Sequence, residues 1–220
     1  MNAWNDWKYF ETVVIDNINL TKDAFLLKFK RGFNFKAGQV IGLGINTDIE
    51  PRLYSIASGE SDEFIEILYT EKTEGMLTPM LSVLKKGDTI LSTTPFGTFT
   101  EYADSPVCIS TGTGIAPFIS MLKSGKGKNA TFIHGVRSPD YFYFEDLLMK
   151  SINTKYIQCC SGSNSPQYFN GRVTRYLLEH PVSPDKKYYL CGIAEMVVEA
   201  RDVLISRGIP FGNIISEIYF

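Results

Sequence analysis

The sequence has 220 residues, of which 44% are hydrophobic and 21% charged. This length fits one large domain or two small ones, and the globular composition excludes intrinsic disorder, collagen-like repeats and small disulfide scaffolds. Because 22 Lys and Arg residues stand against 24 Asp and Glu residues, the net charge is −2 and no broad basic field suggests nucleic-acid binding.

The amino-terminal residues 1–8 contain no basic segment followed by an apolar run, so we expect no signal peptide. No stretch of eighteen apolar residues occurs, so we expect no membrane span and a cytoplasmic protein. The four cysteines lack the spacing of zinc or iron–sulfur ligands, so we expect reduced thiols and no bound metal. They are Cys108, Cys159, Cys160 and Cys191.

The first half of the chain consists of short β-rich runs separated by turn residues. This spacing predicts an antiparallel barrel or sandwich, interrupted by one short helix near residues 78–85. The expected strands are 12–15, 24–29, 39–43, 64–69 and 89–92.

From Ser105 onward, strand-like and helix-like segments alternate. This rhythm predicts a parallel sheet wrapped by helices. We place the boundary within residues 98–105, which gives domains 1–103 and 104–220. The expected strands are 107–110, 131–135, 156–160, 188–191 and 214–218. The expected helices are 116–123, 144–150, 173–179 and 195–207.

The segment Arg52-Leu53-Tyr54-Ser55 is the first candidate for binding chemistry. Alternate residues of a strand share a face, so Arg52 and Tyr54 are expected to point the same way. A guanidinium can grip a phosphate while a phenol ring stacks on an aromatic ring, and the Ser55 hydroxyl can donate or accept a hydrogen bond. An ordinary strand would show the same pattern.

The glycine-rich segment Gly112–Pro117 follows an apolar strand and opens a helix. In this context, glycine lets backbone N–H groups approach a pyrophosphate, and Pro117 is tolerated in a first helical turn. The third glycine of the usual dinucleotide fingerprint is absent, so a tight turn without a ligand also fits.

A third candidate, Cys191–Met196, also leads from a strand end into a helix. Open α/β sheets bind ligands outside the carboxyl ends of their strands. By this geometry Gly112, Gly135, Cys160 and Cys191 line one edge of the sheet. A buried structural cysteine would account equally well for Cys191.

Taken in this order across the change of domain, the three segments resemble the ferredoxin–NADP reductase family, especially its compact bacterial members. The resemblance covers nearly the whole chain. It implies an antiparallel FAD-binding β-barrel domain followed by an α/β NADP(H)-binding domain. Arg52, Tyr54 and Ser55 match the family's R-x-Y-S motif, in which Arg binds the flavin phosphate, Tyr lies against the isoalloxazine and Ser lies near the flavin N5.

The resemblance also assigns a second flavin element, Gly75-Met76-Leu77-Thr78, in which Thr78 is a natural N-cap for a helix. Tyr219 and Phe220 match the family's aromatic carboxyl terminus, with Tyr219 over the isoalloxazine face and Phe220 towards the adenine. The residues expected to bind FAD are Arg52, Leu53, Tyr54, Ser55, Leu68, Gly75, Met76, Leu77, Thr78, Thr113, Tyr219 and Phe220.

For the nicotinamide nucleotide, the resemblance implies a set that spans several strand ends. These residues are Gly112, Thr113, Gly114, Arg137, Ser161, Arg172, Cys191, Gly192 and Met196. The chain departs from NADPH-preferring relatives at Ser161-Gly162-Ser163, where those relatives often carry Ser-Arg-Glu. The arginine that would pair the 2′-phosphate is therefore missing, and no acidic residue replaces it.

The resemblance implies a flavoenzyme that transfers electrons between NADP(H) and ferredoxin or flavodoxin, by hydride transfer to FAD. Ser55, Cys191, Glu217 and Tyr219 are the expected catalytic residues, with Glu217 as a proton relay. We expect a monomer with a transient carrier partner. Two alternatives stay open: an NADH-dependent reductase subunit that serves an oxygenase, and a non-catalytic flavin or nucleotide sensor.

Overall fold

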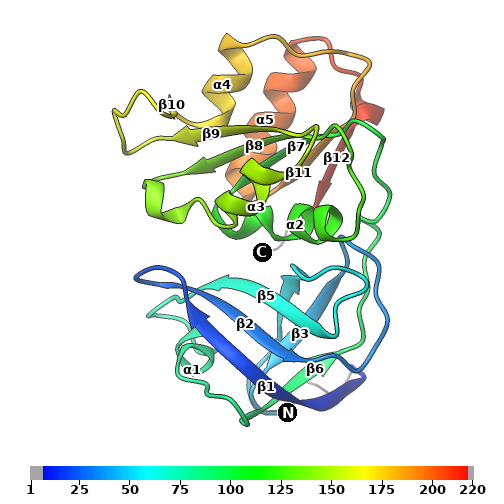
Figure 1. Ribbon diagram of the computed structural model, residues 1–220, viewed down its shortest axis with the longest axis vertical. Coiled ribbons are helices and arrows are strands. Elements are labelled where there is room, and N and C mark those ends of the chain that lie inside the picture. Colours follow the sequence, from blue (N-terminus) through cyan, green and yellow to red (C-terminus); the bar gives the residue numbers. More distant parts are fainter. Residues whose placement is uncertain (1–6, 218–220) are drawn as a thin grey trace. The chain divides into compact units, whose positions relative to one another are not determined.

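The computed structural model describes residues 7–217, which divide into two compact units (Figure 1). The first comprises the described residues up to Thr100 together with Ala116–Ser124, and the second comprises Glu101–Ile115 and the described residues from Gly125 onward. The domain limits 1–103 and 104–220 stay a prediction from sequence.

The first unit is an antiparallel sheet of six strands in the order β4-β3-β6-β1-β2-β5. A bridge between Ile56 and Ile67 joins the end of β4 to the opposite edge strand β5, so the sheet is nearly closed into a barrel. The strands are β1 (Tyr9–Asn19), β2 (Ala24–Lys30), β3 (Val40–Gly44), β4 (Arg52–Ser55), β5 (Phe64–Thr70) and β6 (Thr89–Thr93).

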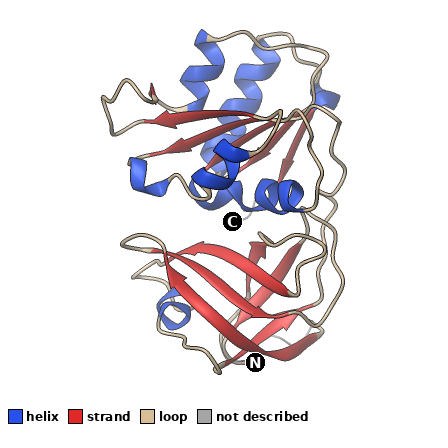
Figure 2. Cartoon of the chain, viewed as in Figure 1, coloured by secondary structure: helices blue, strands red, loops and turns tan. Residues whose placement is uncertain are grey.

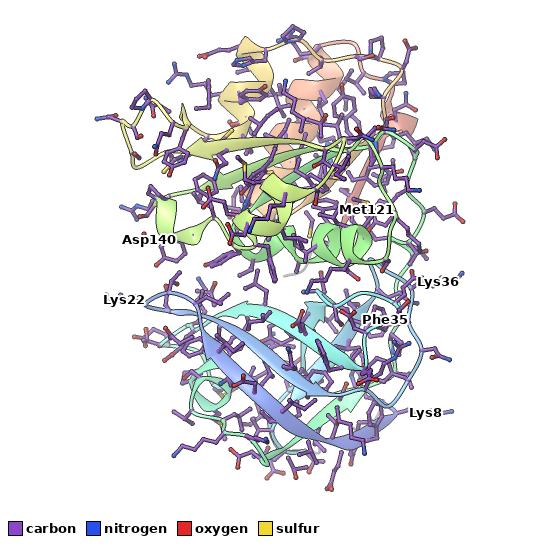
Figure 3. All side chains as sticks on the ribbon, in the orientation of Figure 1. Lys8, Lys22, Phe35, Lys36, Met121 and Asp140 are labelled. Carbon is purple, nitrogen blue, oxygen red and sulfur yellow. The ribbon has the colours of Figure 1, made fainter. Side chains whose placement is uncertain are left out.

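Alternation along these strands builds the barrel core. On β5, Ile65, Ile67 and Tyr69 belong to one cluster of buried apolar side chains, while the residues between them lie on the opposite face of the strand and are buried outside this cluster. Phe35 also belongs to this cluster, whereas its neighbour Lys36 is exposed (Figure 3). A short helix, α1 (Thr78–Ser82), contributes Leu81 to the same core.

The helix α2 (Ala116–Lys123) belongs to the first unit although it follows the first strand of the second. Its Ser120 hydroxyl donates to the Ser58 carbonyl at 2.6 Å. Lys123 forms an ion pair with Glu66, whose other carboxylate oxygen lies 3.3 Å from the Lys28 ammonium nitrogen. Glu66 is 5% exposed, so these two lysines compensate a buried charge.

The second unit contains a six-stranded parallel sheet in the order β10-β9-β8-β7-β11-β12. Its strands are β7 (Val107–Thr111), β8 (Thr131–Val136), β9 (Lys155–Cys160), β10 (Phe169–Asn170), β11 (Tyr188–Cys191) and β12 (Ile214–Glu217). The two-residue strand β10 is absent from the sequence prediction.

Two helices, α4 (Val173–Glu179) and α5 (Ala194–Ser206), run side by side over one face of this sheet (Figure 1). They bury Leu177, Ala200 and Leu204 against the strand residues Ile109 and Leu190. A third helix, α3 (Glu145–Lys150), contacts β9.

The strand-rich first unit and the alternating strands and helices of the second (Figure 2) confirm the predicted fold class, an antiparallel barrel followed by an α/β parallel sheet.

Candidate active site

The carboxyl ends of the parallel strands meet at one edge of the second unit's sheet. Ser110 on β7 is paired with Cys191 on β11, and Cys191 with Glu217 on β12. On the other side of β7, Ser110 is paired with His134 on β8. Four polar side chains therefore form a row across the sheet, within two positions of the strand ends, where such sheets bind ligands.

Two loops leave this edge and touch through their backbones. A 3-10 turn, the glycine turn (Gly112–Ile115), follows β7, and Gly192 follows β11. A Cβ at Gly114 would lie 2.4 Å from the Cys191 carbonyl oxygen, and a Cβ at Gly192 would lie 2.3 Å from the Thr111 hydroxyl. The two loops can approach this closely because both positions are glycine. The structure thus brings together two predicted segments that lie almost 80 residues apart.

Cys191 is buried at this contact. Burial and, to a lesser extent, the charge of Glu217 raise the pKa of the Cys191 thiol well above its usual value. The thiol is therefore neutral and offers shape and a weak S–H donor instead of a thiolate nucleophile. Met196 is also buried, and its methyl carbon lies 2.8 Å from the position that a Cβ on Gly192 would take.

Two hydroxyl oxygens at the end of β7 are buried without a hydrogen-bond partner within residues 7–217. They belong to Ser110 and Thr111, beside the glycine turn and Cys191. Buried polar atoms are usually satisfied, because an unmade hydrogen bond costs about 1–3 kcal/mol. Their position is consistent with an edge that receives a polar ligand.

The basic candidates lie in the loops that follow the neighbouring strands. Arg137 follows β8 and Ser161 follows β9; both are exposed. Arg172 is exposed immediately before α4, and the adjacent Gly171 N–H donates to the Cys160 carbonyl at 3.1 Å. The register of the strands therefore places three predicted polar positions along one edge.

Gly162 cannot accept the arginine that NADPH-preferring relatives often have here. A Cβ at Gly162 would lie 2.3 Å from the Arg137 carbonyl oxygen, a backbone atom that cannot move aside without shifting the loop. The close packing between the loops after β8 and β9 thus depends on the absence of a side chain at Gly162. A Gly162→Arg variant would distort the site before it could sharpen coenzyme preference.

The first candidate segment lies on β4 of the barrel. Arg52 is exposed, and Leu53, Tyr54 and Ser55 are half-buried. The Tyr54 ring packs against the barrel core and meets the Tyr69 ring edge-on, with centroids 6.4 Å apart. Burial raises the pKa of Tyr54 to about 12 while the nearby charge of Arg52 opposes the increase. Tyr54 is therefore a neutral phenol with a guanidinium nearby.

Leu68 and the Gly75 loop lie elsewhere in the same unit. Leu68 is buried on β5, between core-facing neighbours, and pairs with Leu26 on β2. In the loop, the Gly75 N–H donates to the Lys72 carbonyl at 2.7 Å. Met76 is exposed and Leu77 is buried.

The prediction that Thr78 caps α1 is wrong. Leu77 is the N-cap residue and Thr78 is the first residue of the helix. The Thr78 hydroxyl accepts a hydrogen bond from the Lys72 N–H at 2.8 Å, so it closes the loop before the helix instead of satisfying a helix N–H. The predicted residues Tyr219 and Phe220 lie outside the described residues.

Sequence reasoning missed two polar residues beneath the glycine turn. His134 is fully buried on β8; its Nε2 lies 2.9 Å from the Gly112 carbonyl oxygen, and its Nδ1 lies 3.1 Å from the Tyr156 hydroxyl oxygen. Burial lowers the pKa of His134 to about 4, against a smaller opposing effect of the Gly112 bond. The available signal was a histidine one position before the glycine at the end of an otherwise apolar strand.

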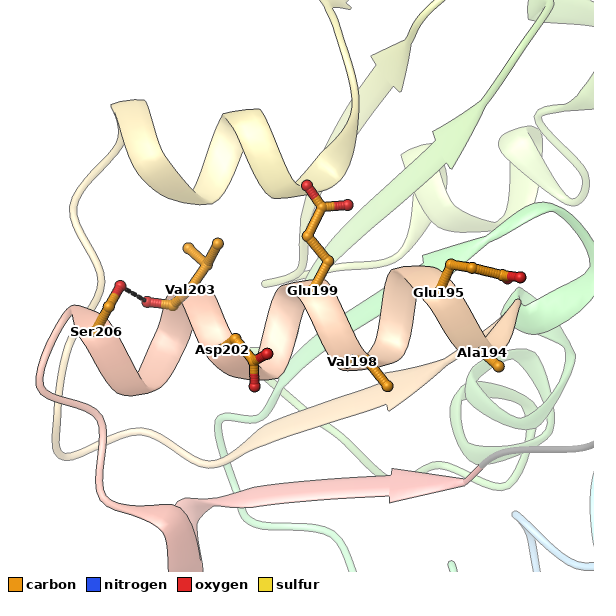
Figure 4. Close-up of a pocket in the computed structure, with 7 residues that line it drawn as sticks. All are labelled: Ala194, Glu195, Val198, Glu199, Asp202, Val203 and Ser206. Carbon is orange, nitrogen blue, oxygen red and sulfur yellow. Dashed lines mark hydrogen bonds between the residues drawn. The ribbon is translucent and has the colours of Figure 1, made fainter.

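A surface pocket on α5 lies apart from the candidate site residues. Figure 4 shows a shallow pocket whose lining residues all come from α5, among them Glu195, Glu199 and Asp202. Three carboxylates disfavour a phosphate, and none of the predicted site residues lines this pocket.

Within residues 7–217, no cluster of three or more His, Cys, Asp or Glu side chains could hold a metal ion. No helix in the same range has the length and apolar character of a membrane span.

Comparisons with known proteins agree with this fold. Residues 108–202 match the family described as "Oxidoreductase NAD-binding domain". The ferredoxin–NADP reductase of Pseudomonas aeruginosa is 29% identical, with 95% of this chain and 93% of that protein covered. The reductase component of propane 2-monooxygenase from Mycolicibacterium goodii is 31% identical over 86% of this chain, but this chain spans 62% of that protein's length.

Among solved structures, a ferredoxin–NADP+ reductase from Neisseria gonorrhoeae, described with bound FAD and NADP, has a TM-score of 0.87. It is 24% identical, and the match covers 97% of this chain and 99% of that one. The barrel and the parallel sheet share the two-domain fold of this reductase, and residues 108–202 match an oxidoreductase NAD-binding domain. The predicted resemblance to the ferredoxin–NADP reductase family is thereby confirmed.

Proposed function

We propose that this chain is a flavin-dependent oxidoreductase that transfers electrons between NADP(H) and a one-electron carrier, ferredoxin or flavodoxin. The observation that supports it most is the contact between the glycine turn and the Cys191-Gly192 backbone, with Glu217 on the adjacent strand. This arrangement places a neutral thiol and a carboxylate at the sheet edge where a nicotinamide nucleotide would bind. Action as a cytoplasmic monomer is part of the same proposal.

The arginines fit ligands that carry phosphates. The chain has seven, and four of them bind carbonyl or carboxylate groups of the protein. The guanidinium groups of the other three have no hydrogen-bond or ion-pair partner within residues 7–217. These arginines are Arg52, Arg137 and Arg172. These are the three that the motifs assign to FAD or NADP(H), and a guanidinium fork is suited to phosphate.

When bound, FAD would accept a hydride from NADPH and release electrons one at a time to the carrier. The protein's part is to bind, orient and exclude water. Arg52 would hold the flavin phosphate, and Tyr54 would offer its ring to the isoalloxazine. The glycine turn would receive the dinucleotide, Cys191 would set the position of the nicotinamide, and Glu217 would hold or pass a proton.

The direct test is whether the purified protein carries FAD, and whether NADPH reduces it. We expect a yellow protein that NADPH bleaches without oxygen and that then reduces ferredoxin or flavodoxin. Arg52→Ala should raise the Kd for FAD by about 10- to 100-fold, since a hydrogen bond to a charged group contributes about 1.5–3 kcal/mol. The paired Arg201, which binds Asp202, provides a control in Arg201→Ala. A flavin-free protein, or unchanged flavin affinity in Arg52→Ala, would contradict this assignment.

Coenzyme preference should depend on Arg172 and Arg137, since Gly162 supplies no guanidinium. We expect Arg172→Ala and Arg137→Ala each to raise the KM for NADPH by about 10-fold and to change the KM for NADH by less than about twofold. Steady-state diaphorase assays with both coenzymes measure this. Arg175→Ala, which removes an arginine already paired with Glu179, is the matched control. Parallel losses with both coenzymes would contradict a 2′-phosphate role.

A second function is supported by the likeness to oxygenase reductase components. In this alternative the chain uses NADH and delivers electrons to an oxygenase, which the loop Ser161-Gly162-Ser163 would favour. Better turnover with NADH than with NADPH in the unmodified protein would favour this function over the first.

A further inference from the structure

We propose that His134 is a positioning residue that fixes the peptide between Gly112 and Thr113, and so aims the Thr113 N–H at the dinucleotide. This inference deepens the proposed function and rests on it. It assigns a role to a polar pair, the buried His134 and the half-buried Tyr156, that the flavin and nucleotide motifs do not include. The supporting observations all lie within the second unit.

The hydrogen bonds of His134 are consistent with one tautomer. A carbonyl oxygen can only accept, so the 2.9 Å contact with Gly112 requires a proton on Nε2. Because the ring is neutral, Nδ1 is then an acceptor, and the Tyr156 hydroxyl at 3.1 Å donates to it. Burial raises the pKa of Tyr156, which keeps this donor protonated. The edge of Phe142, with its ring centroid 5.6 Å away, completes the ring's surroundings.

Gly112 is a position where such a restraint matters. It has φ +52° and is the first residue of the short 3-10 turn that follows β7, so its carbonyl lies outside the strand ladder and within only one turn of helix. No cis peptide occurs within residues 7–217, and in a trans peptide the C=O and N–H groups point in opposite directions. A Gly112 carbonyl aimed at the buried His134 therefore aims the Thr113 N–H away from it.

The neighbouring atoms make the turn intolerant of rotation about this peptide. Gly114 is already packed against the Cys191 carbonyl, so the turn is held on its other side by a close backbone contact. His134 and Cys191 thus hold the turn at two points, one through a hydrogen bond and one through contact. An unpaired Gly112 carbonyl would allow the peptide to turn over and would withdraw one backbone donor from the ligand.

The test uses the holoprotein with four variants. His134→Phe keeps a ring but removes the Nε2 donor, and His134→Gln retains an amide donor. Tyr156→Phe leaves the imidazole but removes the hydroxyl that donates to Nδ1. The only other histidine, His180, is stacked on Tyr176 beyond the end of α4, so His180→Gln is the matched control. The readouts are kcat and KM for NADPH, Kd for NADP+ by calorimetry, FAD content and imidazole nitrogen NMR.

We expect His134→Phe to raise both the KM for NADPH and the Kd for NADP+ by about 10-fold, the effect of one lost hydrogen bond. We expect kcat and FAD content to change by less than about twofold. Tyr156→Phe should give a smaller increase, and His134→Gln should recover most of the affinity. With two histidines in the chain, NMR can assign each ring, and His134 should be neutral with the proton on Nε2.

Three results would overturn the inference. One is unchanged nucleotide affinity in a folded His134→Phe protein. Another is loss of FAD and kcat in proportion to KM, which indicates general damage. The third is a proton on Nδ1 of His134 in the unmodified protein. If His134→Phe does not fold, Tyr156→Phe and the NMR tautomer still decide. Absence of any NADP+ binding or NADPH oxidation in the unmodified protein would instead count against the proposed function.

Discussion

We expect the Gly114→Ala substitution to raise the KM for NADPH by at least about 100-fold while FAD remains bound, because a misplacement of about 1 Å can cost this much. The added Cβ would lie 2.4 Å from the Cys191 carbonyl oxygen and 2.7 Å from the Gly192 Cα. Both are backbone atoms, so the glycine turn and the loop after β11 must separate. Stopped-flow reduction by NADPH and FAD absorbance measure the two outcomes.

Gly212→Ala is the matched control for this experiment. Gly212 lies between β11 and β12 in the chain, and nothing is within 4 Å of the position that its Cβ would take. We expect wild-type kinetics and flavin content from this variant. Wild-type nucleotide affinity in a folded Gly114→Ala protein would show that the contact between the two loops does not position the nucleotide.

The sequence predicts the fold well because its signals are local. Strands that are short apolar runs, such as β5, and helices with a clear apolar side, such as α4, need no knowledge of distant residues. The edge where Gly112 and Cys191 meet also follows from the pattern, since carboxyl ends of parallel strands share one edge. The two-residue strand β10 is too short to carry a periodic signal.

The remaining features depend on partners that are distant in the sequence. Thr78 has the residue type and place of an N-cap, but its hydroxyl closes the loop from Lys72 instead. Glu66 gives no sequence sign that it will be buried, because its partner Lys123 is 57 residues away on a helix of the later half. His134 is likewise unremarkable until the strand register places it below Gly112. Local propensity does not carry this information.

The second large effect should come from Cys191→Ala, which we expect to slow hydride transfer from NADPH about 100-fold and to leave FAD content unchanged. Cys191 is 3% exposed and paired in register with Ser110 and Glu217, and its carbonyl touches Gly114. Burial holds its pKa well above the usual value, so the loss would be one of shape and a weak donor rather than of a thiolate. Single-turnover reduction under argon measures the rate.

Cys108→Ala separates this role from simple loss of core volume. Cys108 is also a buried thiol with a pKa raised by burial, but it lies on β7 in register with Tyr189, two positions before Ser110. Each of the two alanine variants removes one buried sulfur atom from the same sheet, and both should destabilise the protein similarly, by about 1–2 kcal/mol. Only the Cys191 position lies at the sheet edge beside the glycine turn. Equal rates of hydride transfer in the two variants would therefore remove Cys191 from the reacting centre and leave it a packing residue.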